Sequence, residues 1–187
     1  RRWVTCGRNV LAWEAGAGRS VKLNLYDASN QGTGLWSKKV DLPAKGFIID
    51  GEELALLEPS GKFTVVSLKS GKPLVEISVD PEPALQGIAV VASREQYLLA
   101  INQAVTGETN GVSSAPLQYG ATGGAAVNGK VYALDRATGA AQWQTPACVS
   151  QHGLPEDQLT DSSVLAGVRR RSSTHGGGIP TNDGSSL

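Results

Sequence analysis

Residue types that carry out chemistry are few in this chain and lie far apart. The histidines are His152 and His175, the cysteines are Cys6 and Cys148, and neither a Cys-x-x-Cys nor a His-Glu-x-x-His spacing occurs. Zinc sites draw on such closely spaced pairs. We therefore expect no catalytic, cofactor-binding or metal-ligating residues, a loop position for His152, and two buried free thiols unless the fold brings the cysteines together as a disulfide.

Carboxylates and lysines also cluster at short spacings. Asp50-Gly51-Glu52-Glu53 offers oxygen ligands or an acid–base pair, but it lacks the alternating ligands of a calcium loop. Gly61-Lys62 and Gly71-Lys72 lack the upstream glycine of a phosphate-binding loop. All three segments combine residue types that favour turns, so we interpret them as turns between strands.

The secondary structure of the chain is indicated most clearly by the segment VYALDRATGAAQW, which begins at Val131. Its first four residues form a β-rich run, and Asp135 can accept backbone hydrogen bonds that close a turn. Gly139 can adopt the positive φ that such turns need. Trp143 is then expected on a returning strand over 140–145, as a large apolar anchor.

Two weaker copies of this pattern precede it. Aligning Asp27, Lys69 and Asp135 gives separations of 42 and 66 residues, and propeller blades repeat roughly every 40–50 residues. Chance similarity among hairpins is the alternative interpretation. The repeats predict an all-β fold, a partial β-propeller of about three to four blades made of four-stranded antiparallel sheets. The repeat positions are Tyr26, Asp27, Trp36, Leu68, Gly71, Tyr132, Leu134, Asp135, Thr138, Gly139 and Trp143.

The segment VYALDRATGAAQWQTPA resembles the repeat of pyrroloquinoline-quinone-like (quinoprotein-like) β-propellers, in which a strand, an Asp, a Thr-Gly turn and a Trp follow one another. The middle copy departs from it, with Lys69 for the Asp and Val75 for the Trp. The phrases WVTCGRNVLAWE and LALLEPSGKFTVVSLKSGKPL extend the resemblance to propeller segments of large planctomycete-type bacterial proteins, from Arg2 to about Gly167. This repeat implies a fold more than an activity.

The four tryptophans have two interpretations. Trp3, Trp13, Trp36 and Trp143 could stack on a flat cofactor or a sugar, but two of them occupy equivalent repeat positions. Blade-to-blade packing explains that equivalence, so we expect all four in the core.

The domain prediction assigns residues 1–168 to the propeller, with an insertion at 106–128 that is poor in bulky apolar residues, and 169–187 to a disordered polar tail. The tail's Arg169-Arg170-Arg171 run could also be a nucleic-acid patch or a phosphorylation site. Residues 156–168 could form a short helix instead of a strand over 163–167. Strands are expected at 3–5, 9–14, 20–27, 35–42, 46–50, 53–58, 62–68, 73–79, 86–92, 96–102, 129–135 and 140–145.

Composition limits the classes of function. Of 187 residues, 40% are hydrophobic and 23 are glycine, and 17 basic side chains balance 17 acidic ones. A net charge of zero gives no reason to expect nucleic acid as a partner. The sequence contains no run of about 18 apolar residues, so it predicts no transmembrane segment. The chain has no methionine, and a propeller closes with 4–8 blades, so we expect a fragment of a longer protein.

The expected function is therefore that of a non-catalytic propeller segment, a scaffold or protein-interaction module within a larger bacterial protein. Its partner would be another protein or another domain of the parent chain. The alternative is a fragment of a pyrroloquinoline-quinone-dependent dehydrogenase, which the resemblance allows but which would need a catalytic Asp and calcium ligands. The resemblance also implies a periplasmic or cell-envelope location, since propellers of this kind are commonly exported.

Overall fold

The structure is a computed structural model and describes residues 2–15, 18, 20–103, 124–155, 168–173 and 181–186. These residues form fourteen strands in three antiparallel sheets. Blade 1 comprises β1 (Arg2–Cys6), β2 (Asn9–Ala15), β3 (Ser20–Asp27) and β4 (Thr33–Asp41). Blade 2 comprises β5 (Lys45–Ile49), β6 (Glu53–Leu57), β7 (Lys62–Ser67) and β8 (Pro73–Ser78). Blade 3 comprises β9 (Leu85–Ala92), β10 (Gln96–Gln103), β11 (Gly124–Asp135) and β12 (Ala147–Pro155), and its sheet continues into β13 (Val168–Ser173) and β14 (Thr181–Ser186).

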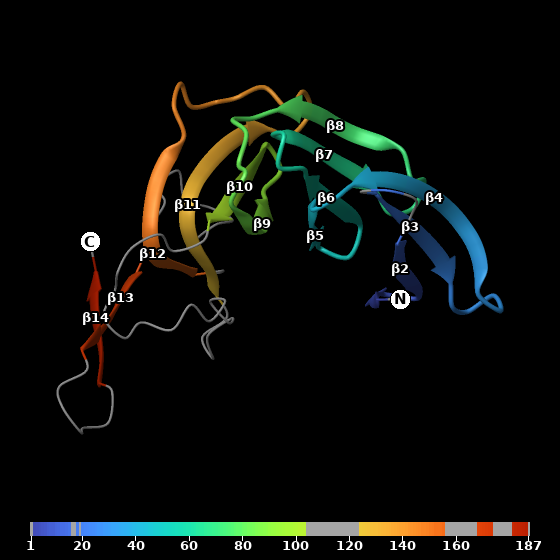
Figure 1. Cartoon of the computed structure of the whole chain (residues 1–187), viewed down its shortest axis with the longest axis horizontal. Helices are drawn as coiled ribbons and strands as arrows, with labels where there is room; N and C mark the ends of the chain where they lie inside the picture. The colour runs from blue at the N-terminus through green and yellow to red at the C-terminus, as the bar shows by residue number, and fades with distance from the viewer. Residues whose placement is uncertain are drawn as a thin grey trace.

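The three blades follow one another around an arc (Figure 1), with β4 and β8 on its outer side. Each blade is a meander in which sequential strands pair, and β5 contacts β9 at the inner side of the arc. The second strands begin at Asn9, Glu53 and Gln96, so successive blades repeat after 44 and 43 residues. The chain is a partial β-propeller of three four-stranded blades, as the sequence predicts.

Blade 2 shows why these strands need neighbours on both sides. Along β6, Leu54 and Leu56 belong to the core shared with blade 1, whereas Ala55 and Leu57 belong to the core shared with blade 3. All four are buried, because alternate side chains of a strand point to opposite faces of the sheet. A sheet that is apolar on both faces is stable only when it is covered on both, and the blades on either side cover it.

Most of the predicted strands are confirmed to within two residues at each end. The strand expected over 140–145 is wrong: this stretch is not a strand, and it is joined to β11 by a bridge between Leu134 and Ala141 and by backbone bonds from the Asp135 N–H to the Ala140 carbonyl and from the Gln142 N–H to the Ala133 carbonyl. The fourth strand begins at Ala147 instead, after Pro146, which has no N–H to donate and disfavours regular pairing before it.

The structure also differs from two predictions about longer segments, the insertion and the tail. The expected insertion at 106–128 overlaps β11, which already begins at Gly124. The segment expected to be a disordered tail carries β13 and β14, which pair from Val168–Ser186 to Ser173–Thr181. Hydrogen bonds between the backbones of edge strands do not require apolar side chains, so the polar composition of this segment does not indicate the two strands. The strand or helix expected within 156–167 lies outside the described residues, and the domain division itself stays a prediction.

Within the described residues, no helix has the length and apolar character needed to cross a bilayer.

Candidate functional site

The turn that follows the third strand is built alike in blades 1 and 3. Asp135 Oδ1 accepts hydrogen bonds from the N–H groups of Ala137 and Thr138, at 3.1 and 2.8 Å, and from the Thr138 hydroxyl at 2.8 Å. Asp27 Oδ1 likewise accepts from the N–H and the hydroxyl of Ser29. These bonds favour the charged carboxylates and lower the pKa of both aspartates. The Asp-closed turns expected at both positions are present.

In blade 2 the residue that takes the place of the aspartate is Ser67, and the alignment through Lys69 is wrong. The Gly71 N–H donates to the Ser67 carbonyl just as the Gly139 N–H donates to that of Asp135, both at 2.8 Å. The Ser67 hydroxyl accepts from the Ser70 N–H at 3.4 Å, which is a weaker form of the Asp bond. The equivalent positions are thus 27, 67 and 135.

The glycine of this turn makes the contact between blades 1 and 2. Gly71 has a φ of 69°, and a Cβ atom built on it would lie 2.6 Å from Cγ of Trp36 on β4. The Trp36 indole N–H donates to the Leu68 carbonyl at 2.7 Å. The turn of one blade therefore rests on the indole of the preceding blade, and only glycine leaves room for it.

The same contact recurs between blades 2 and 3. A Cβ on Gly139, whose φ is 76°, would lie 2.6 Å from both Val75 Cγ1 and Ile77 Cγ2 on β8. Val75 follows its own turn glycine, Gly71, by four residues, as Trp36 follows Gly32. The residue four positions after each turn glycine is thus the surface on which the next blade's turn glycine packs.

Trp143 is the third residue at this spacing, four positions after Gly139. It lies outside a regular strand and is 36% exposed. Trp36 and Trp13 are half-buried against the core between blades 1 and 2, whereas Trp3 is 67% exposed. The expectation that all four tryptophans are core residues is therefore wrong for Trp3 and for Trp143.

The outer edges of the blades carry a second repeated feature. Leu35 on β4 and Leu74 on β8 each lie three residues after a turn glycine, and they are 44% and 48% exposed. Together with Trp143 they give each blade an exposed large apolar side chain near this turn, and Trp3 on β1 and Leu42 in the β4–β5 connection are exposed elsewhere. We call Leu35, Leu74 and Trp143 the rim residues.

Neither known protein families nor curated proteins match the sequence. Similar solved structures include BamB from Moraxella catarrhalis, with a TM-score of 0.44 and 18% identity over 86% of this chain and 40% of that chain. A europium-containing methanol dehydrogenase is similar with a TM-score of 0.42 and 13% identity, over 73% of this chain and 23% of that one. The chain spans less than half the length of either of these two proteins.

A polar clamp, which sequence reasoning missed, joins blades 2 and 3. The Tyr97 hydroxyl donates to Glu53 Oε2 at 2.8 Å, and the Arg136 guanidinium donates to Glu53 Oε1 at 2.9 Å and to the Ser93 carbonyl at 2.6 Å. The guanidinium also lies 5.3 Å from the centre of the Tyr97 ring. The sequence predicts a turn that ends at Glu53 and a strand that begins there, and nothing local links Glu53 to residues 44 and 83 positions away.

The clamp makes stability depend on pH in the alkaline range. Burial, followed by the Glu53 carboxylate, raises the pKa of Tyr97 to about 12. The folded state therefore keeps a proton that the unfolded chain loses near pH 10, and folding stability should fall as the pH rises from 10 to 12, by roughly 2–3 kcal/mol. Urea midpoints across this range test the prediction. Tyr97→Phe should remove the decline that exceeds the background from other groups, and equal slopes in both proteins would contradict it.

A second polar cluster lies where β10 ends and β11 begins. Buried Glu82 accepts a bond from the Gln103 amide and one from the Ala84 N–H at 3.2 Å. The Asn102 amide oxygen accepts from the Asn128 N–H at 2.7 Å, and Lys130 pairs with Asp80 at 2.8 Å. The bond to Lys130 lowers the pKa of the Asp80 carboxyl. These contacts tie the Asp80–Pro83 connector to blade 3 at two irregular points of its ladder, Asn102/Gln103 and Val127/Gly129.

The remaining candidates from the sequence lie apart. Asp50 and Gly51, with φ values of 49° and 71°, lie in the three-residue turn between β5 and β6, where a turn is expected. Cys6 and Cys148 are free thiols; Cys6 is buried, which raises its pKa, but Cys148 is exposed, contrary to expectation. The backbone of His152 is in β12, not in a loop, because this stretch pairs with β11. His175 lies outside the described residues.

Across the described residues, no three His, Cys, Asp or Glu side chains come together in a group that could hold a metal ion.

Proposed function

We propose that this chain is a propeller segment that acts as a scaffold or protein-interaction module within a larger bacterial protein. The rim residues carry the proposal, because they place an exposed large apolar side chain on each blade, three residues after the turn glycine in blades 1 and 2 and four residues after it in blade 3. Exposed apolar side chains on a rigid frame, rimmed by charged residues such as Lys39 and Glu76, are typical of surfaces that bind proteins.

Blade packing supports the same function. Trp36 and Val75 each receive the turn glycine of the following blade, and Trp143 occupies the equivalent position on blade 3. A partly exposed indole at that position is suited to receive a similar glycine turn from another domain of the parent chain or from another protein.

A triple variant tests the proposal. Leu35→Ser, Leu74→Ser and Trp143→Ser together should remove specific partners from proximity labelling of the full-length parent. The free energy of unfolding, measured with urea, should fall by less than about 1 kcal/mol for each substitution because these side chains are partly exposed. The matched control is Ser37→Ala with Glu76→Ser, exposed positions on the same strands, which should keep the partners. An unchanged partner set in the triple variant would refute a role for the rim.

The alternative of a quinone-dependent dehydrogenase fragment stays a prediction. Dye-linked alcohol oxidation by the full-length parent with added quinone and calcium tests it.

A further inference from the structure

The interface between blades 1 and 2 is closed at one end and hollow at the other. A cavity of about 550 Å³ lies between the two sheets, which is within the range of small-molecule sites. Trp13 and Leu23 line it from blade 1, Ile48 and Leu54 line it from blade 2, and the connection from Leu42 to Ala44 borders it. We call this cavity the inter-blade slot.

The slot is a local feature of this interface. The part of the interface near Trp36 is closely packed, with Leu25 and Leu68 buried and Gly71 against the indole. Blades 2 and 3 also meet directly at their inner strands, where β5 contacts β9. The hollow end of this interface therefore contrasts with its closely packed end and with the direct contact between β5 and β9.

The walls of the slot restrict what can fill it. They are mostly the faces of two antiparallel sheets, and the strands β2, β3 and β6 that present most of the apolar lining are paired in ladders on both sides. A peptide strand lying between these faces would find no backbone partners on them, which is costly in an apolar environment. The walls suit an occupant that is apolar along its whole length.

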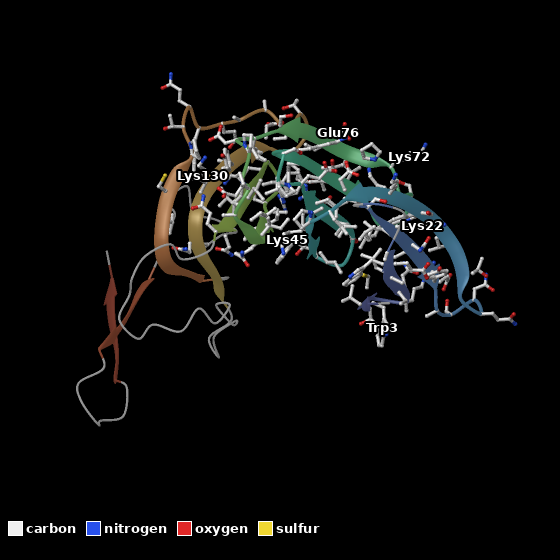
Figure 2. The ribbon with its side chains drawn as sticks, viewed as in Figure 1. Trp3, Lys22, Lys45, Lys72, Glu76 and Lys130 are labelled. Atoms are coloured by element: carbon white, nitrogen blue, oxygen red, sulfur yellow. The ribbon has the colours of Figure 1, made fainter. Side chains whose placement is uncertain are left out.

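The charged side chains at the opening of the slot indicate which chemical group the bound molecule carries at that end. Half-buried Lys45 lines the slot, and it makes no ion pair with any of the described side chains. Figure 2 shows Lys45 on the inner side of the arc, near β5. Asp41 also lines the slot but is exposed to solvent, which screens its charge. The half-buried ammonium favours an anionic group at this end.

We propose that the inter-blade slot binds a free fatty acid. The unbranched alkyl chain lies between the sheet faces, beside the Trp13 indole, and the carboxylate meets the Lys45 ammonium at the mouth. This site is independent of the rim residues, so the proposal stands or falls separately from the scaffold function.

Trp13 provides the first test, since it is the tryptophan that lines the slot. Dodecanoic acid brominated near its methyl end should quench tryptophan fluorescence of the whole chain in a saturable way. Trp13→Phe should lose most of this quenching while Trp3→Phe retains it. Non-saturable quenching, or equal loss in the two variants, would overturn the proposal.

Gly46 allows the slot to be filled without straining the backbone. A Cβ at this position meets the side chains of Leu56 and Leu54 at 3.5 and 3.7 Å, which are ordinary contacts. Gly46→Leu should therefore fold normally and weaken fatty-acid binding at least tenfold. Unchanged affinity in a folded Gly46→Leu protein would show that the acid binds elsewhere and would overturn the proposal.

Lys45→Gln tests the headgroup without altering the apolar walls. It should weaken binding of dodecanoic acid about two- to fivefold, as expected for a partly exposed ion pair, and leave binding of dodecanol unchanged. An equal effect on acid and alcohol would contradict the assigned orientation.

Discussion

Replacement of Gly71 by alanine should lower the free energy of unfolding by roughly 2–4 kcal/mol. Two effects add. The φ of 69° is unfavourable for any residue with a Cβ, and that Cβ would lie 2.6 Å from Trp36 Cγ, well inside van der Waals contact. The indole must move, which also disturbs its 2.7 Å hydrogen bond to the Leu68 carbonyl. Urea denaturation followed by tryptophan fluorescence measures the loss.

Gly32 supplies the matched control. Its φ of 72° is nearly the same, but a Cβ there meets nothing within 4 Å. Gly32→Ala should cost only the backbone part, about 1 kcal/mol. If the two alanine variants are equally destabilised, the contact between blades contributes nothing beyond backbone conformation, and the role assigned to the turn glycine is wrong.

Replacement of Glu53 by alanine should destabilise the chain by roughly 2–4 kcal/mol. The variant leaves the buried Tyr97 hydroxyl and the partly buried Arg136 guanidinium without their shared acceptor. An unsatisfied buried group costs more than a hydrogen bond contributes when it is made. Urea denaturation again provides the measurement, and it reports on the join between blades 2 and 3.

Two further variants serve as controls for Glu53→Ala: one breaks an exposed ion pair, and the other is a double variant that measures the coupling between Glu53 and Tyr97. Lys62→Ala breaks the Lys62–Glu76 pair, whose side chains are about half exposed, and should cost less than about 1 kcal/mol. Combining Glu53→Ala with Tyr97→Phe should cost about 1 kcal/mol less than the sum of the single variants, because the hydrogen bond is lost only once. Strict additivity would mean that the two residues do not interact energetically.

The repeat of strand, turn and apolar residue was sufficient to predict the blades, because each of its parts acts locally. Asp135 closes its turn with bonds to residues two and three positions ahead, and such bonds can be recognised from residue types alone. The same reasoning misplaced the middle turn by two residues. Ser67 is a weaker signal than Asp, and only the backbone bond from Gly71 reveals its equivalence.

The contacts between blades were harder to predict than the blades. Glu53 and Arg136 are 83 positions apart, Glu53 at the start of β6 and Arg136 in the turn after β11, and neither stands out from its local sequence. The slot is harder still, because a cavity depends on how closely two sheets approach and not on which residues line them. Trp143 was misjudged for a related reason: Pro146 delays the fourth strand of its blade and leaves the indole partly exposed.

The unequal interfaces give the molecule an uneven mechanical character. Blades 2 and 3 share a continuous core and the clamp around Glu53, so they should move as one body. Blade 1 is joined to that body by the three-residue connection from Leu42 to Ala44, by a buried core shared with blade 2, and by the packing around Trp36 at one end, but by no polar clamp among the described residues. A joint that is firm at one end and hollow at the other acts as a hinge, and small rotations of blade 1 about it would widen or narrow the inter-blade slot.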